Sequence, residues 1–193
     1  LDVPGATLKE DDRANGMRVY AFATPLPPGA EFDFGYRIDI RNPGFTNSGS
    51  AGRIHHNGTF FDNLTYFPQF GYQRGNEIQD RNERRERGLG DPRRMPKLEA
   101  TTRQWNYLGD DADWLDFKST VCTSPDQTAM APGYLQREWT EGGRRCFRYE
   151  MDAPILGFWA YLSAHWEVKK DQWNDVAIEV YYDRKHPYNV DRM

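Results

Sequence analysis

The sequence predicts an all-β (β-rich) fold in which antiparallel sheets form a saddle or a sandwich, with a long irregular central loop region. Aromatic residues make up 15% of the 193 residues, and aromatic side chains fit the half-buried surfaces of strands. Residues 31–41 alternate strictly between apolar and charged side chains, as a strand with one dry face does. Residues 134–140 and 144–151 flank a short glycine turn, which is typical of a β-hairpin. A chain of this length can bury one sizeable core, so one domain is the default expectation.

The first strand-rich part covers residues 17–55. A short apolar run at 17–24 ends at the turn signal Pro25-Leu26-Pro27-Pro28-Gly29, where proline fixes φ and glycine accepts a positive φ. Turn residues at 42–50 predict a flexible connection. In the strand expected at 31–41, the residues that should face the core are Phe32, Phe34, Tyr36, Ile38 and Ile40.

The second strand-rich part covers residues 114–182. Alternation from Phe117 to Cys122 predicts a strand, which Pro125-Asp126-Gln127 closes as a turn. Further proline-containing breaks separate the strands that follow. The strands expected in this part are 117–122, 128–131, the hairpin arms 134–140 and 144–151, 155–168 and 176–182.

The central stretch, residues 56–89, fits neither a helical nor a strand period. It holds four Phe and two Tyr among polar residues, so we expect an irregular surface loop. These aromatic residues either plug the end of a β-core or line a cleft, and the two roles are compatible. The arginines at 81–94 alternate with acidic residues, which predicts i,i+3 or i,i+4 ion pairs on a solvated helical turn. Residues 98–114 are expected to form a loop with one or two short turns.

Charge and composition exclude several classes of protein. The net charge is −4, with both signs spread along the chain, whereas nucleic-acid binding needs a concentrated basic face. We therefore expect no nucleic-acid partner. No apolar run approaches the ~20 residues needed to cross a bilayer, and residues 1–10 lack the features of a signal peptide. Because the chain starts at Leu1 rather than at methionine, we expect it to be part of a longer polypeptide.

The sequence contains no familiar catalytic or metal-binding pattern. Its histidines are His55, His56, His165 and His186. They lack H-E-x-x-H spacing, and adjacent histidines on a strand point to opposite faces, so we expect no metal ligand here. There is no G-x-S-x-G nucleophile motif, so no catalytic residue is expected either. Cys122 and Cys146 lie in strand-like stretches, and a disulfide and two unpaired buried thiols fit the sequence equally well.

Six segments carry a resemblance to a known family. The central stretch contains N-G-T-F-F-D-N, F-P-Q-F-G-Y-Q and D-R-N-E-R-R-E-R-G-L. Further along the chain are S-T-V-C-T-S-P-D-Q-T-A-M-A-P-G-Y-L, F-R-Y-E-M-D-A-P-I-L and N-D-V-A-I-E-V-Y-Y. Together they resemble the N-terminal, non-catalytic β-saddle domain of aminopeptidase N-like zinc metallopeptidases (gluzincins). The most similar subgroup is bacterial, with such a region attached to ABC-transporter permease segments, and the resemblance covers most of residues 17–190.

The resemblance implies a domain organisation and a set of partners. Residues 1–175 would form the β-saddle domain, and residues 176–193 would begin the catalytic domain of the same polypeptide. In the family, zinc is held by H-E-x-x-H and a downstream glutamate, and a G-x-M-E-N loop helps to hold the substrate's amine; this chain has none of these motifs. We therefore expect no cofactor in this chain, zinc in the parent's catalytic domain, and a peptide substrate. The parent is expected to be membrane-attached, with this part extracytoplasmic, in the periplasm.

The resemblance also implies which residues line the substrate cleft. The family's saddle domain contributes a Gln or Glu upstream of an F-P-C-F-D-E-P-like segment, which looks equivalent to residues 67–72 here. The family spacing puts Asn57 near the glutamine position and Thr59 near the acidic one, although neither residue is acidic. The cleft residues implied in this way are Asn57, Gly58, Thr59, Phe60 and Phe61. The alternative is a free-standing β-sandwich that binds a partner protein or a glycan through the aromatic loop 56–72.

Overall fold

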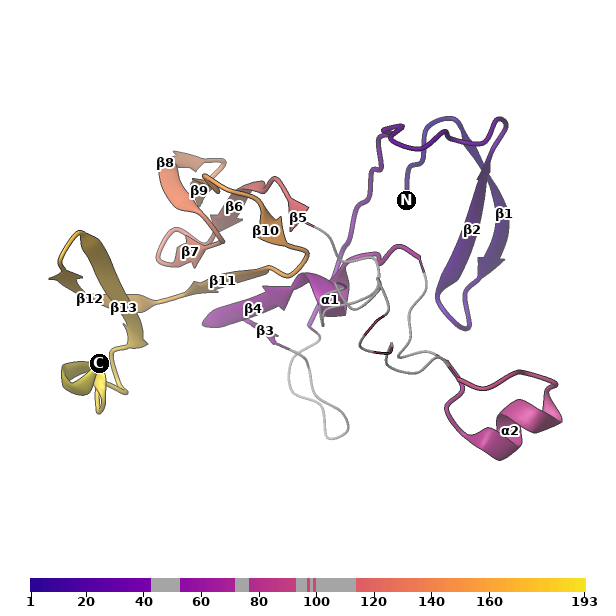
Figure 1. Cartoon of the computed structure of the whole chain (residues 1–193). Coiled ribbons are helices and arrows are strands. Elements are labelled where there is room, and N and C mark those ends of the chain that lie inside the picture. Colours follow the sequence, from indigo (N-terminus) through magenta and orange to yellow (C-terminus); the bar gives the residue numbers. More distant parts are fainter. Residues whose placement is uncertain (43–52, 72–76, 93–96, 98, 100–113) are drawn as a thin grey trace. The chain divides into compact units, whose positions relative to one another are not determined.

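The computed structural model describes residues 1–42, 53–71, 77–92, 97, 99 and 114–193. The chain divides into two compact units, Leu1–Ile40 and Arg41–Met193. Every sheet in the described residues is antiparallel, and helices are few and short (Figure 1). The predicted all-β class is therefore confirmed.

The first unit contains one hairpin, formed by β1 (Ala6–Asp12) and β2 (Met17–Phe22). The sequence predicted β2 but not β1, whose central residues are polar. The carboxylate of Asp12 holds the connecting turn by accepting hydrogen bonds from the backbone N–H groups of Ala14 and Asn15, both at 3.1 Å. The predicted proline-rich turn is also present, closed by a 3.0 Å hydrogen bond from Ala30 N–H to the Pro27 carbonyl.

The strand predicted at residues 31–41 is wrong. The structure has only an isolated bridge there, in which the backbones of Asp2 and Gly35 exchange hydrogen bonds of 2.6 and 2.8 Å. Phe32, expected in the core, is 46% exposed and meets the ring of Phe22 edge-on at 5.4 Å. Alternation reports which side of an extended segment is apolar, but a strand also needs a neighbouring strand to share its hydrogen bonds. That second condition is not local, and the hairpin β1–β2 does not supply it.

The second unit contains a four-stranded sheet with the order β3-β4-β11-β7. Its strands are β3 (Ile54–His55), β4 (Gly58–Asp62), β11 (Ala160–Ala164) and β7 (Thr128–Met130). The irregular loop predicted for residues 56–89 is thus wrong for Gly58–Asp62, which forms an inner strand. An inner strand can carry large apolar side chains on both faces. With Phe60 and Phe61 adjacent, the sequence of β4 therefore lacks the alternation of apolar and polar residues by which a strand is recognised.

Two short helices follow in the central stretch, α1 (Asn63–Tyr66) and α2 (Arg81–Glu86). The predicted ion pairing of the arginine-rich segment is confirmed by the i,i+4 pair of Glu83 and Arg87 at 3.1 Å. Arg84, in contrast, is buried, and its guanidinium donates to Glu77 and to the carbonyls of Ile78 and Gly90. The connections predicted at 43–50 and 100–113 lie outside the described residues.

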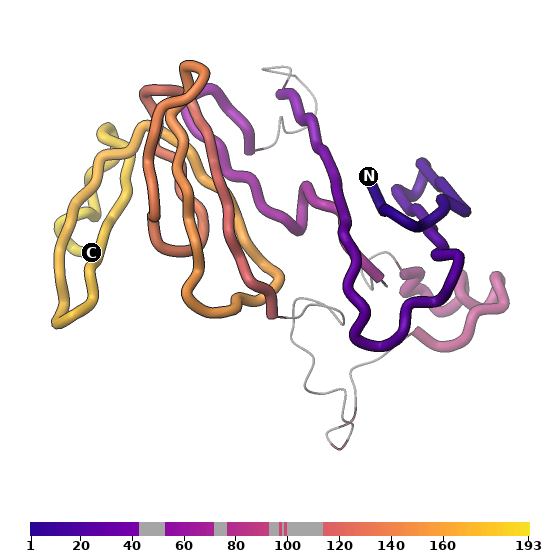
Figure 2. The backbone as a smooth tube through the Cα atoms, turned by 90° about the horizontal axis from the view of Figure 1, so that it is seen from above, coloured from indigo at the N-terminus to yellow at the C-terminus, as the bar shows by residue number. Residues whose placement is uncertain are grey.

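A three-stranded sheet forms the other large part of the second unit, with the order β6-β9-β8. Its strands are β6 (Lys118–Thr123), β9 (Arg144–Glu150) and β8 (Tyr134–Glu141), which run side by side in Figure 2. The predicted hairpin of β8 and β9 is confirmed. Its turn residues Gly142 and Gly143 both have positive φ, at 56° and 74°, as the type I′ turn that is common in two-residue hairpins requires.

The two sheets meet at β7. Ala129 of β7 is fully buried and packs with Phe147 and Tyr149 of β9 in the core cluster, with Val121 and Ala131 beside it. The hydroxyl of Tyr149 donates to the Ala129 carbonyl at 2.9 Å, and burial raises the pKa of this phenol. A small side chain at Ala129 is what lets the aromatic rings of the second sheet approach this closely.

The remaining strands form two separate pairs. β5 (Trp114–Leu115) pairs with β10 (Ile155–Leu156), and β12 (Trp166–Trp173) forms a hairpin with β13 (Val176–Asp183). The turn of this hairpin includes Asn174 at φ 54°, and it contains the domain boundary expected between residues 175 and 176. The chain ends in the 3-10 helix η3 (Val190–Arg192). No helix in the described part of the chain is long and apolar enough to cross a membrane.

We predict that Gly133→Ala is strongly destabilising. Gly133 has φ 106°, and an added Cβ would lie 2.6 Å from the carbonyl carbon and oxygen of Glu150. Backbone atoms cannot move aside as a flexible side chain can, so we expect a loss of more than about 3 kcal/mol in urea denaturation. The control is Gly142→Ala, at φ 56° with no atom within 4 Å of the new Cβ, which should cost only about 1–2 kcal/mol. Equal losses for the two variants would contradict this packing.

Candidate functional site

The predicted cleft residues begin at a tight turn. His56 and Asn57 connect β3 to β4, and both are exposed. Among the non-glycine residues that the structure describes, only Asn174 has a positive φ, so the backbone of Asn57 is unstrained. Gly58 follows, and a Cβ there would lie 3.4 Å from the Cβ of Ala164. The strands β4 and β11 therefore pack closely directly below the turn.

A buried polar cluster holds this turn in place. Gln127 is only 4% exposed, and its side-chain amide donates to the His56 carbonyl at 2.7 Å. The amide oxygen of Gln127 accepts from the hydroxyls of Ser163, at 2.6 Å, and Thr123, at 3.1 Å. These two buried hydroxyls also contact each other. Since both polar atoms of the Gln127 amide are used, the cluster stabilises one position of the turn.

Arg145 extends the cluster towards the second sheet. Its guanidinium donates to the Gln127 carbonyl at 3.3 Å and to the Thr128 hydroxyl at 3.1 Å. The same group lies 4.9 Å from the ring centre of Phe147 and pairs with Glu138 at 2.5 Å. One arginine thus links the turn before β7 to both β9 and β8.

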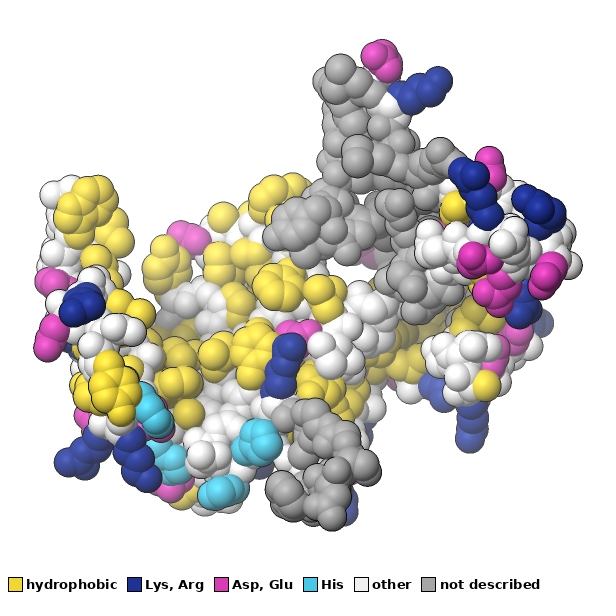
Figure 3. All heavy atoms as spheres, turned by 90° about the horizontal axis from the view of Figure 1, so that it is seen from below, with side chains coloured by type: hydrophobic (Ala, Val, Ile, Leu, Met, Phe, Trp, Pro, Cys, Tyr) yellow, Lys and Arg dark blue, Asp and Glu magenta, His cyan; other side chains and the backbone are white. Residues whose placement is uncertain are grey.

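The exposed rim of the site carries a contact between a histidine and a carboxylate. His165 follows β11, and its Nε2 lies 2.8 Å from the carboxylate of Asp126. The hydrogen bond from His165 is the main cause that lowers the pKa of Asp126. Figure 3 shows histidine side chains gathered on one face of the second unit. Among the residues with described positions, no group of three or more His, Cys, Asp or Glu side chains is arranged to hold a metal ion.

The two phenylalanines of β4 have different surroundings. The guanidinium of Arg53 lies 5.1 Å from the ring centre of Phe60 and also pairs with Asp62 at 3.0 Å. The ring of Phe61 stacks on that of Tyr66 at 4.4 Å. Phe61 belongs to an aromatic cluster, whose members are Phe61, Tyr66, Phe67, Phe117, Trp159 and Tyr161. Phe61 and Phe67 therefore help to pack the interior, whereas Phe70, at 55% exposure, does not.

The structure brings only some of the predicted site residues to the surface. Asn57 is exposed, while Gly58, Thr59, Phe60 and Phe61 are half-buried in β4. The polar residues that position Asn57 were missed by the sequence reasoning. Gln127 and Ser163 lie 36 residues apart, and Gln127 and His56 lie 71 apart, so no local pattern could have connected them.

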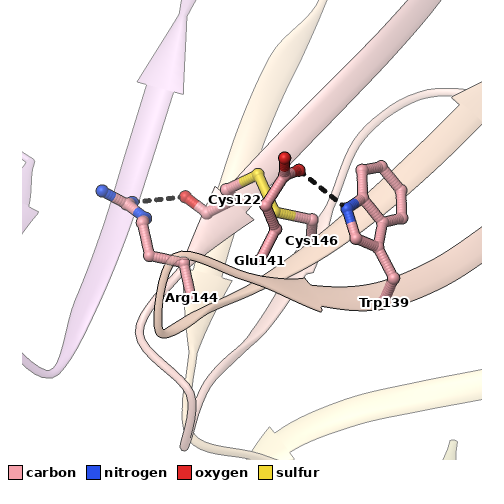
Figure 4. Close-up of a disulfide and its surroundings, with 5 residues drawn as sticks. All are labelled: Cys122, Trp139, Glu141, Arg144 and Cys146. Carbon is pink, nitrogen blue, oxygen red and sulfur yellow. Dashed lines mark hydrogen bonds between the residues drawn. A yellow bond between two sulfur atoms is a disulfide. The ribbon is translucent and has the colours of Figure 1, made fainter.

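Cys122 and Cys146 form a disulfide that joins directly opposite residues of β6 and β9 (Figure 4). The sequence left this pairing open. Cys122 precedes Thr123 in the buried polar cluster, and Cys146 is 1% exposed. The bond therefore covalently fixes the sheet that supports the candidate site.

The polar groups of this site are hydrogen-bond donors and acceptors of neutral side chains and of the backbone. The Ser163 hydroxyl donates to an amide oxygen, whereas a serine nucleophile would donate to a general base. Asn57 offers an amide that can both donate and accept, next to the exposed backbone of a fixed turn. Such groups can hold the backbone of a bound peptide.

Comparisons with known proteins add nothing to the class that the fold shows, which is all-β. No protein-family model matches the chain, and no curated protein or solved structure matches it. The chain is thus described by its own features, an all-β antiparallel fold with a braced, exposed turn.

We predict that Gln127→Met loosens the turn. The variant leaves the His56 carbonyl and two buried hydroxyls without their partner, which should cost about 1–3 kcal/mol in urea denaturation. Amide hydrogen exchange at the turn should also become faster. The control is Gln136→Met, because the Gln136 amide bonds only the nearby Tyr134 carbonyl at an exposed position, and a change within about 0.5 kcal/mol is expected. Unchanged exchange in Gln127→Met would show that the cluster does not hold the turn.

We also predict that the double variant Cys122→Ser, Cys146→Ser is less stable. The disulfide spans 24 residues, and closing a loop of that size stabilises a domain by about 3 kcal/mol. The same loss should appear when the unaltered chain is denatured in reductant, and reductant should not affect the double variant. A double variant as stable as the oxidised chain would be incompatible with this bond.

Proposed function

We propose that this chain is a non-catalytic, extracytoplasmic β domain that scaffolds a zinc aminopeptidase-like catalytic domain of the same polypeptide and lines its peptide-binding cleft. The observation that carries the proposal is the His56–Asn57 turn, whose side chains are exposed while a buried glutamine holds its backbone from below. A binding surface that is already ordered loses less conformational entropy when a ligand binds. The resemblance of the flanking segments to the β-saddle domain points to a peptide as that ligand.

Asn57 is the residue proposed to contact the peptide. In the resemblance it stands near a position that helps to hold the substrate's amine, and an asparagine can accept one hydrogen bond from such an amine without adding a charge. Thr59 is half-buried and pairs with Ser163 in the sheet. In this proposal Thr59 therefore supports the strand, and Asn57 makes the contact.

The extracytoplasmic location is supported by the disulfide of Cys122 and Cys146. Disulfides persist in oxidising compartments such as the periplasm and are rare in the cytosol. The membrane attachment of the parent and the zinc of its catalytic domain rest on the resemblance, and both are part of the proposal.

A second candidate function is a free-standing module that binds a partner protein or a glycan through residues 56–72. The exposed ring of Phe70 favours it, because aromatic rings at a surface contribute much of the energy of recognition. The complete open reading frame distinguishes the two candidates. A downstream H-E-x-x-H supports the cleft-wall proposal, whereas a stop codon shortly after Met193 supports the free-standing module.

We predict that Asn57→Ala, made in the full-length polypeptide, weakens peptide binding more than it lowers stability. One lost hydrogen bond corresponds to about 0.5–1.5 kcal/mol, so KM for an aminoacyl reporter should rise about three- to tenfold with little change in Tm. Asn82→Ala is the matched control, because Asn82 is an exposed asparagine in the separate helix α2. A drop in Tm without a change in KM would favour a purely structural role for the turn.

We further expect the 193-residue chain alone to release no amino acid from aminoacyl reporters. The measurement is turnover with and without added zinc, beside an authentic aminopeptidase as positive control. Zinc-dependent turnover by this chain would overturn the non-catalytic assignment.

A further inference from the structure

The sheet β6-β9-β8 has an outer face that points away from the core cluster. The pairing register places every second residue of β6 and β9 on this face. In β8 the register shifts between Leu135 and Arg137, so its members on this face are those paired with outer-face residues of β9. The charged members of the face are four basic residues and two acidic ones, while the whole chain has a net charge of −4. The charged residues of the outer face are Lys118, Arg137, Arg144, Arg148, Glu141 and Glu150. This face is therefore opposite in charge to the chain as a whole.

Two arginines of the outer face lie directly opposite each other. Arg137 of β8 is the register partner of Arg148 of β9, and both are exposed. Like charges at directly opposed positions destabilise a sheet. Arg148 is partly offset by Glu150, with Nε 2.8 Å from the carboxylate. Within the described ranges Arg137 has no carboxylate partner, and its guanidinium instead lies 5.0 Å from the ring centre of Trp139.

The sheet that carries these arginines is cross-linked beside them. Trp139 is opposite Cys146 in the register, and its indole N–H donates to Glu141 at 3.1 Å. Figure 4 shows Trp139 and Arg144 on either side of the disulfide, with Glu141 between them and Arg144 donating to the Cys122 carbonyl. The disulfide holds the backbones of β6 and β9 in register.

β8 is also an edge strand. It pairs with β9 on one side, and in the described part of the chain no strand pairs with its other side. Tyr134 and Leu135 at its start are 63% and 50% exposed. An open edge of this length can accept a further strand through backbone hydrogen bonds. Side chains of an added strand would alternate between the two faces, and every second one would meet the outer face.

We propose that β8 binds an extended acidic peptide segment of a partner protein by strand addition. Carboxylates on one face of the added strand would lie beside Arg137 and offset its repulsion with Arg148. The surface is separate from the His56–Asn57 turn, so the proposal does not depend on the cleft function. Charge complementarity and the open edge are two independent observations that select the same ligand.

The test is titration calorimetry of the 193-residue chain with a capped eight-residue peptide that alternates Glu and Val. We expect binding that weakens as salt is added. The matched peptide that alternates Lys and Val should not bind. A version of the acidic peptide N-methylated at alternate residues, which removes the backbone donors on one edge, should lose binding. Absence of binding by the acidic peptide would overturn the proposal.

Variants distinguish strand addition from a general attraction of charges. Arg137→Glu should lower the affinity for the acidic peptide at least about tenfold, because the new carboxylate would lie next to the carboxylates of the peptide. Arg184→Glu makes the same charge change at an exposed position after β13 and should leave the affinity unchanged. Two results would refute the site by showing that the interaction is nonspecific electrostatic attraction. One is an equal loss of affinity in the two variants, and the other is an N-methylated peptide that binds as tightly as the unmethylated acidic peptide.

A stability measurement separates this role from a structural one. Arg137→Thr and Arg148→Thr each remove the like-charge opposition, so each should weaken peptide binding while Tm stays the same or rises. A fall in Tm in both variants, with affinity retained, would show that the arginines serve the fold rather than a ligand.

Discussion

The amide group of Gln127 is the interaction on which the second unit depends most. It joins a hairpin turn to the hydroxyls of two different sheets, and all three of these contacts are made by one side chain. Because its surroundings are buried, each of its polar atoms would be costly if left without a partner. The glutamine therefore fixes the relative positions of the β3–β4 turn, β6 and β11. Apolar packing alone would define these positions less well.

Ala129, two residues after Gln127, packs in the apolar core beside this polar contact. Its side chain leaves room for the rings of Phe147 and Tyr149, and its carbonyl accepts the Tyr149 hydroxyl. Gln127, just before β7, thus makes the polar contacts of the site, and Ala129 within β7 packs in the apolar core two residues later. Any change at β7 is expected to affect the candidate site and the core together.

The elements that could be predicted from sequence are those whose determinants are local. The β8–β9 hairpin needs only two strand-like arms and the Gly142-Gly143 turn, and it is present as expected. Residues 31–41 have the most regular alternation in the chain, but no strand of the described residues pairs with them beyond one isolated bridge. Local sequence does not report whether a partner strand is present. β4 was hidden by apolar residues on both faces. The buried polar cluster could not be predicted, because its members meet only after two sheets have formed. Asn57 was proposed through a resemblance rather than through a physical pattern, and it stays a prediction.

The position of the disulfide has a mechanical consequence. The loop closed by Cys122 and Cys146 contains β7, Gln127 and β8. When the two ends of the chain are pulled apart, the force is transmitted through the disulfide, and the residues between the two cysteines are not stretched. About 80 Å of contour length, the extended reach of the 24-residue span, is thereby withheld from stretching. Under pulling forces that extend the rest of the polypeptide, Gln127 and the strands β7 and β8 inside this loop would therefore not be stretched, whereas the His56–Asn57 turn lies outside it.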